Sequence, residues 1–245
     1  MLNALTCIEI GASVWYIWQI DHKNNVSKAK SLPVPANTLW NPNAMAQLIN
    51  ERIGKKVIFL LNTSQTIIKL SEDSLLAQDL SYEKDGYIIN CSIFDNKKMW
   101  TSATPKSLPN YLIEMCRLKK IRTGRIQVID TLDYRITRYL SKLYSSILWI
   151  LLPQEPGIRL IVLQNGIPLS SYFFSNNPDF RENELTRIWL HESFSPQHAV
   201  ILSDDKAYEW LNYFLKEKFV ELSDSHSHMN FRQAMIMEWV KEIAR

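Results

Sequence analysis

The chain has 245 residues, enough to bury a sizeable hydrophobic core in one domain or in two small ones. Hydrophobic residues make up 46% and charged residues 22%, a balance that is typical of globular proteins and excludes a disordered chain. The net charge of +3 is too small to indicate a nucleic-acid-binding protein.

Cysteine usage favours a reducing compartment, and the apolar runs fit neither a signal peptide nor a membrane helix. Cys7, Cys91 and Cys116 are odd in number and lack metal-site spacing, which argues against a disulfide framework and a zinc site. The segment 2–20 is apolar in parts, but Glu9 interrupts it and no basic segment precedes it, so it does not fit a signal peptide. No apolar run approaches the roughly 20 residues of a membrane helix. We therefore expect a cytoplasmic protein.

The first elements predicted along the chain form a β-hairpin and a strand–helix unit. Apolar runs at 5–10 and 14–20 flank a glycine-containing turn, which predicts a hairpin. The polar segment 21–30 is predicted to be a loop or a hairpin tip, and the proline-rich segment 31–42 to be irregular chain. A helix capped by Asn43 or a neighbour runs to about Ile53, is closed by Gly54, and leads into a buried strand at 56–61.

The middle of the chain alternates strands and helices. Strands are predicted at 66–70, 87–94 and 99–104, with a short helix or loop at 72–80. Ser107 is a candidate N-cap for a helix whose inner face carries Leu108, Tyr111, Leu112, Met115 and Leu118. A basic turn, a strand at 126–129, and a helix capped by Asp130 or Thr131 follow. The inner face of that helix carries Leu132, Ile136, Tyr139, Leu140 and Leu143. This alternation predicts an α/β layer.

The second half begins with three closely spaced strands, predicted at 147–152, 158–163 and 169–174. Asn165-Gly166 is a type I′ turn signal, because both central residues of that turn need a positive φ. The remaining predicted elements are helices at 182–194, 207–219 and 231–244 and strands at 198–202 and 220–222.

The order of these elements resembles the family of the type IV pilus protein PilM and the cytoplasmic part of the type II secretion protein GspL. The resemblance is carried by Thr104-Pro105-Lys106 after a strand, the basic turn 119–124, and Val128-Ile129-Asp130 at the end of the next strand. The turn Gln164-Asn165-Gly166-Ile167-Pro168 also matches, and the resemblance covers residues 5–222.

The resemblance implies an α/β chain with the actin-like (ribonuclease-H-like) fold and mixed sheets. It implies an actin-like subdomain I at 1–145 and a subdomain II at 146–245. It further implies a scaffold at the inner face of the inner membrane that binds inner-membrane pilus or secretion proteins and contacts the assembly ATPase. Such a protein would associate with the membrane only through its partners and would not bind nucleic acid.

In that family the first hairpin holds phosphates with its backbone amides, and its acid organises metal-bound water. Glu9, Gly11 and Ser13 stand there in this chain, so the resemblance assigns them to a vestigial phosphate loop. The second phosphate turn, 153–157, carries two prolines, which remove N–H groups that a phosphate needs. Ser203-Asp204 replaces the glycine pair that lets adenosine approach. We therefore expect no catalytic residue, no bound metal and no cofactor.

Two enzymatic alternatives stay open. A small actin-like ATPase would bind ATP and magnesium through Glu9 and Gly11, and a ribonuclease-H-like nuclease would group Glu9 with Asp204-Asp205. His226-x-His228 lacks a third metal ligand and is interpreted as surface.

The aromatic residues also suggest an interface. The chain has eight tryptophans and ten tyrosines, most of which are expected in the core. Trp15, Trp18 and Trp40 are candidates to line a partner groove, because aromatic side chains anchor interfaces.

Overall fold

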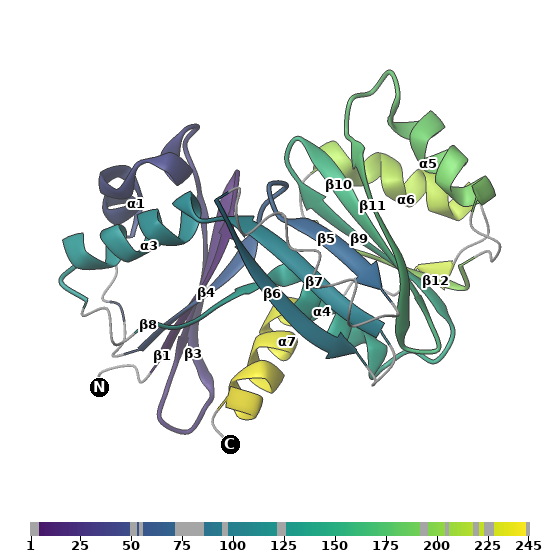
Figure 1. Ribbon diagram of the computed structural model, residues 1–245. Helices are drawn as coiled ribbons and strands as arrows, with labels where there is room; N and C mark the ends of the chain where they lie inside the picture. The colour runs from purple at the N-terminus through teal and green to yellow at the C-terminus, as the bar shows by residue number, and fades with distance from the viewer. Residues whose placement is uncertain are drawn as a thin grey trace.

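The computed structural model describes residues 5–49, 53, 56–71, 86–94, 98–121, 126–191, 196–203, 206–217, 221–222 and 228–243. Two five-stranded sheets, one three-stranded sheet and the helices that cover them form the molecule (Figure 1). The predicted helix or loop at 72–80 and the pair Asp204-Asp205 lie outside the described residues.

The first sheet contains the hairpin predicted at the start of the chain. Its strand order is β3-β2-β1-β4-β8, in which β1 pairs antiparallel with β2 and parallel with β4. These strands are β1 (Leu5–Gly11), β2 (Val14–Ile20), β3 (Val26–Pro33), β4 (Lys56–Asn62) and β8 (Ile126–Thr131).

The second sheet repeats this pattern. Its order is β11-β10-β9-β12-β13, in which β9 pairs antiparallel with β10 and parallel with β12. These strands are β9 (Ile147–Gln154), β10 (Gly157–Gln164), β11 (Ile167–Ser175), β12 (His198–Ile201) and β13 (Glu221–Leu222). Asn165 and Gly166 have φ values of 53° and 76°, which confirms the predicted turn between β10 and β11.

The third sheet follows β4 in the chain. It consists of β5 (Ile67–Ser71), β6 (Tyr87–Phe94) and β7 (Lys98–Pro105), with β7 in the middle. β5 contacts β11 of the second sheet, so this small sheet joins the two larger ones.

Helices cover both large sheets. α1 (Pro42–Leu48) and α3 (Ser107–Leu118) pack on the first sheet, and α5 (Arg181–His191) and α6 (Glu209–Glu217) pack on the second (Figure 1). α4 (Leu132–Ser141) and α7 (His228–Ile243) share one hydrophobic core with strands of both sheets. Short 3₁₀ helices occupy Thr38–Trp40 and Lys206–Tyr208. No helix in the described ranges combines the length and apolar character needed to cross a membrane.

The central core explains why α4 and α7 are essential to the arrangement. Ile58 of β4 and Ile150 of β9 are fully buried in the same cluster as Ile136 of α4 and Trp239 of α7. Because the two helices bury apolar surface from both sheets, they hold the sheets together. The predicted subdomain boundary near residue 145 lies between α4 and β9 and stays a prediction.

Several sequence predictions of element position were wrong. Residues 26–33, predicted to belong to a loop or hairpin tip and to irregular chain, form the edge strand β3. This strand buries little more than Leu32, so its sequence carries a weak apolar signal. The helix predicted with Asn43 or a neighbour as its cap begins after such a neighbour, Asn41, whose side chain accepts hydrogen bonds from two backbone amides, but it ends at Leu48 rather than at about Ile53. Lys106, rather than Ser107, is the N-cap of α3, and its side chain makes no capping bond.

Burial corrects four further predictions. Leu118 and Leu143 were predicted to face inward but are 44% and 58% exposed, because each lies at or beyond the end of its helix. Trp15 and Trp18 are fully buried, one in each core layer around the first sheet, so neither lines a surface groove. Trp40 is partly exposed and packs edge-on against Tyr111.

Candidate functional site

A cleft of about 330 Å³ opens where the two large sheets face each other. The turn between β1 and β2 lines one side, and the turn between β9 and β10 lines the other. The segment after β12 and one side chain of α7 complete it. The lining includes Gly11, Ser13, Tyr16, Asn62, Gln154 and Arg232, whose contacts are described below.

Glu9 of β1 is engaged in a buried ion pair with Arg232 of α7. Arg232 Nε donates to Glu9 Oε2 at 3.1 Å, and Asn62 Nδ2 donates to Glu9 Oε1 at 2.9 Å. The side chains of Glu9 and Arg232 are 0% and 4% exposed. Both oxygens of the Glu9 carboxylate therefore have donors supplied by the chain itself.

Arg232 also connects the first sheet with the second. Its guanidinium carbon lies 4.4 Å from the centre of the Tyr16 ring, which adds a cation–π contact. Its Nη2 donates to the carbonyl oxygen of Leu202, directly after β12, at 3.4 Å. One side chain from near the C-terminal end of the chain thus contacts both walls of the cleft.

A second buried arginine holds the other side of the cleft. Arg159 of β10 donates through Nε to Gln154 Oε1 at 3.2 Å and through Nη2 to the Thr66 carbonyl oxygen at 2.7 Å. Gln154 Nε2 in turn donates to Asp133 Oδ1 at 2.7 Å, and Arg159 Nε lies 3.6 Å from the same oxygen. This chain of contacts joins α4, the second sheet and the segment before β5.

Among the described residues around the cleft, Asp133 has a strongly perturbed carboxyl group. Burial raises its pKa from 3.8 to about 6, and the charge of Glu9 adds to the rise. Arg159 and the hydrogen bond from Gln154 oppose it, so the pKa rise is smaller than burial alone would cause.

The two turns that line the cleft are built differently. A Cβ on Gly11 would lie 2.5 Å from the Val14 carbonyl oxygen, so the first turn has no room for a side chain at that position. The second turn carries Glu155 and Pro156, and Pro156 has no N–H to offer a ligand. Ser64 Oγ donates to the Glu155 carbonyl oxygen at 2.8 Å, which ties this turn to the first half of the chain.

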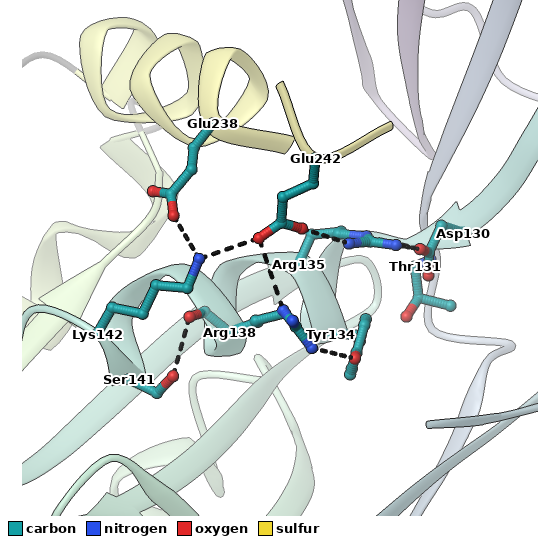
Figure 2. A network of polar contacts seen from close by, with 9 residues as sticks. All are labelled: Asp130, Thr131, Tyr134, Arg135, Arg138, Ser141, Lys142, Glu238 and Glu242. Carbon is teal, nitrogen blue, oxygen red and sulfur yellow. Dashed lines mark hydrogen bonds and ion pairs between the residues drawn. The ribbon is translucent and has the colours of Figure 1, made fainter. Parts of the chain in front are cut away.

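α7, which carries Arg232, is fixed on α4 by a polar network outside the cleft. Figure 2 shows Arg135 of α4 between Asp130 and Glu242, with N–O distances of 2.6 and 3.5 Å. Lys142 pairs with Glu238 and lies 3.0 Å from Glu242. Burial alone would raise the pKa of Glu242, but the hydrogen bond from Lys142 and three nearby cations lower it. The network therefore helps to set the position of α7.

No grouping of three or more His, Cys, Asp or Glu side chains suited to a metal ion occurs within the described ranges. His228 is the first residue of α7, and its predicted companion His226 lies outside those ranges.

Comparison with solved structures places this cleft in a known fold. The chain superposes on a Bacteroides thetaiotaomicron protein with an actin-like ATPase fold and unknown function, with a TM-score of 0.68, 13% identity and 95% of each chain covered. It superposes equally well on a chain of the PilM–PilN type IV pilus biogenesis complex, with a TM-score of 0.67, 13% identity and 96% coverage of each chain. The chain has the actin-like ATPase fold. The cytoplasmic domain of EpsL, an inner-membrane component of the type II secretion system of Vibrio cholerae, matches at a TM-score of 0.52, 8% identity and 94% coverage of each chain.

These matches confirm the fold predicted from the sequence, including the likeness to PilM and GspL-type proteins. No protein-family model and no curated protein sequence matches the chain. The likeness is therefore one of three-dimensional structure.

Within the actin-like fold, the predicted site residues lie close together. Gly11 and Ser13 line the cleft, and Glu9 lies behind it in contact with the lining residues Asn62 and Arg232. Their assignment to a phosphate loop stays a prediction.

Arg232, Asp133 and Arg159 were not predicted as site residues from the sequence, because their partners are distant in the chain. One signal was present for Arg232. It stands four and eight residues before Ile236 and Val240, on a helix face that is otherwise buried and apolar.

Proposed function

We propose that this chain is a non-catalytic cytoplasmic scaffold of a type IV pilus or type II secretion assembly platform, at the inner face of the inner membrane. In this role it binds inner-membrane partner proteins and contacts the assembly ATPase. The observation that carries the non-catalytic part is the buried ion pair between Arg232 and Glu9.

The ion pair argues against magnesium-dependent chemistry at Glu9. A divalent cation near Glu9 would lie beside the fixed positive charge of Arg232 in a poorly solvated region, where repulsion between like charges is strong. Moving Arg232 away would leave a buried charge without a partner, at a cost of about 3–5 kcal/mol. Glu9 is thus more suited to holding α7 in place than to organising a metal-bound water.

The second turn supports the same proposal. Pro156 cannot donate a backbone hydrogen bond, and the Gln154 side chain is held by Asp133 and Arg159. This side of the cleft therefore offers few free donors to a phosphate group.

The platform role rests on the structural neighbours. One of them belongs to a complex of PilM with PilN, and another is the cytoplasmic part of an inner-membrane secretion component. We further propose that each large sheet with its helices forms a subdomain, 1–145 and 146–245, so that a partner can recognise their relative position.

An actin-like ATP-binding protein is the second candidate, and the open cleft is the observation that favours it. About 330 Å³ remains beside Gly11 and Ser13, and the side chain of Ser13 is exposed. In this candidate the ligand would be ATP with magnesium.

A thermal-shift titration separates the two candidates. Mg–ATP at a hundredfold excess over its dissociation constant would stabilise the protein by about 2.7 kcal/mol. We expect no shift with Mg–ATP or Mg–ADP at millimolar concentration. A saturable shift that is absent in Ser13→Trp, a variant that fills the cleft from its exposed edge, would establish the ATP-binding candidate instead.

Binding to partners is tested separately and without lipid. Synthetic peptides covering the cytoplasmic segments of the host's inner-membrane pilus and secretion proteins are titrated into the purified chain, with scrambled peptides as controls. We expect saturable binding of at least one native peptide. If none binds better than its scrambled version, the platform role is wrong.

A further inference from the structure

One edge of the first sheet collects basic side chains that the cleft does not use. In the pairing of this sheet, Leu5 lies opposite both Ile20 and Lys56, and Val57 lies opposite Ile126. The turn after β2 and the starts of β4 and β8 therefore lie at the same edge. Figure 1 shows the amino end of β1, the start of β8 and the β2–β3 turn on one side of the molecule.

The end of α3 belongs to the same edge. Ile121 follows α3, and only five residue steps separate it from Ile126 at the start of β8, which limits their separation to about 18 Å. We define the basic edge by the residues Lys23 after β2, Lys56 at the start of β4, and Leu118, Lys119 and Lys120 at the end of α3.

The α3 end presents an apolar side chain among cations. Leu118 is 44% exposed, and Arg117, Lys119 and Lys120 surround it in sequence. Backbone bonds fix this end, since the Ile121 amide donates to the Cys116 carbonyl oxygen at 2.8 Å. A fixed, exposed leucine flanked by lysines has the chemistry of a side chain that enters the interfacial layer of a membrane.

Two acidic side chains, Asp21 and Glu114, lie near the described part of this edge, and each has partners within the chain. Asp21 Oδ1 accepts hydrogen bonds from the backbone amides of Lys23 and Asn25, which lower the pKa of Asp21. Glu114 pairs with Arg117 at 3.1 Å. Arg117 and the four lysines outnumber these two carboxylates, so the described part of the edge keeps an excess of positive charge from the β2–β3 turn to the end of α3.

We propose that the basic edge docks directly on an anionic lipid bilayer. Its charges are lysines spread over several elements, which suits the diffuse negative charge of lipid headgroups rather than the fixed geometry of one protein or base partner. Exposed Leu118 adds the apolar contact that electrostatic attraction alone lacks. The proposal rests on the proposed place of the chain at the inner membrane, and adds direct lipid contact to contact through partners.

The test is co-sedimentation of the full chain with vesicles. Phosphatidylcholine vesicles containing phosphatidylglycerol are compared with pure phosphatidylcholine vesicles. Each lysine near an anionic surface contributes about fivefold to binding. Lys119→Gln combined with Lys120→Gln should therefore weaken binding to the anionic vesicles about 25-fold. Leu118→Ser should weaken it severalfold.

A matched variant controls for net charge. Lys206→Gln combined with Lys216→Gln removes the same charge from exposed positions on the α6 side of the second sheet and should leave binding unchanged. Equal binding to neutral vesicles, equal loss in both double variants, or no binding by the native chain would overturn the proposal.

Two further controls define the ligand. If single-stranded RNA displaces the chain from anionic vesicles at equal charge concentration, the edge binds nucleic acid and the lipid proposal is wrong. The peptide titrations contain no lipid, so a chain that binds a partner peptide but no vesicle would disprove lipid docking while keeping the platform role.

Discussion

The two large sheets have the same strand order and directions, yet the turns that they bring to the cleft differ in chemistry. Each sheet begins with a hairpin whose turn has two residues, Ala12-Ser13 in the first sheet and Glu155-Pro156 in the second. The residue before the turn is Gly11 in the first sheet and Gln154 in the second. The shared pairing pattern sets the position of each turn, and local residues decide what it can bind.

Each side of the cleft is held by a buried arginine. Arg232 pairs with Glu9 on the first side, and Arg159 contacts Asp133 and Gln154 on the second. Both arginines link segments that are far apart in the chain. The comparison indicates that polar groups of this cleft stabilise the relative position of the sheets.

Arg232→Met tests the first side and should have the largest effect. Methionine keeps an unbranched apolar side chain at this position but has no charge to pair with the buried Glu9. The variant should therefore lower the free energy of unfolding by about 3–5 kcal/mol. The midpoint of urea unfolding at constant slope measures this change. Adding Glu9→Gln should restore much of the loss, because it removes the unpaired charge. A loss below about 1 kcal/mol in the single variant would mean that the pair does not support the fold.

Asp133 tests the second side through its pH dependence. Its pKa is raised from 3.8 to about 6, so the folded state holds a proton over a window in which the unfolded chain has lost it. The stabilisation from this proton is present at low pH and is lost as the pH rises through about 6. Across the window it amounts to about 3 kcal/mol.

The measurement compares native protein with Asp133→Asn, which cannot titrate, in urea unfolding between pH 7 and about pH 4. The native chain should gain stability relative to the variant as the pH falls. A difference that stays constant over this range would show that Asp133 titrates normally.

The glycines beside the two turns sharpen the comparison further. A Cβ on Gly11 would lie 2.5 Å from the Val14 carbonyl oxygen, and one on Gly157 would lie 2.3 Å from the Phe174 carbonyl oxygen. Because these backbone atoms can move away from an added methyl group only with strain, Gly11→Ala and Gly157→Ala should each lower the free energy of unfolding by about 1–3 kcal/mol. Ser13→Ala, at an exposed turn position, is the control. Thermal unfolding in which both glycine variants match this control would contradict the packing argument.

The sequence predicted most strands and helices and the fold they form, because the apolar patterns of β1, β4, β9 and β10 are strong. It missed β3, whose single well-buried side chain leaves no clear alternation. Gly11 and Ser13 belong to the same predicted turn, so the sequence alone was enough to bring them together. It did not find Arg232, because the contact with Glu9 spans 223 positions and depends on how α7 packs between the sheets.

The network between α4 and α7 lies outside the cleft and should give the smallest effect. Lys142 and its partners Glu238 and Glu242 are 34–44% exposed, so water and salt screen their attraction. Lys142→Met should cost up to about 1 kcal/mol in urea unfolding at low salt and less at high salt. Lys241→Met, at an exposed position of α7, is the control.

The pH dependence of this network should oppose that of Asp133. The pKa of Glu242 is lowered and that of Lys142 is raised. Their pairing is therefore lost when a falling pH protonates Glu242 or when a rising pH deprotonates Lys142. Acidification should therefore weaken the hold of α4 on α7 while the Asp133 side of the cleft gains stability. If Lys142→Met instead costs as much as Arg232→Met, the surface network rather than the buried pair fixes α7 between the sheets.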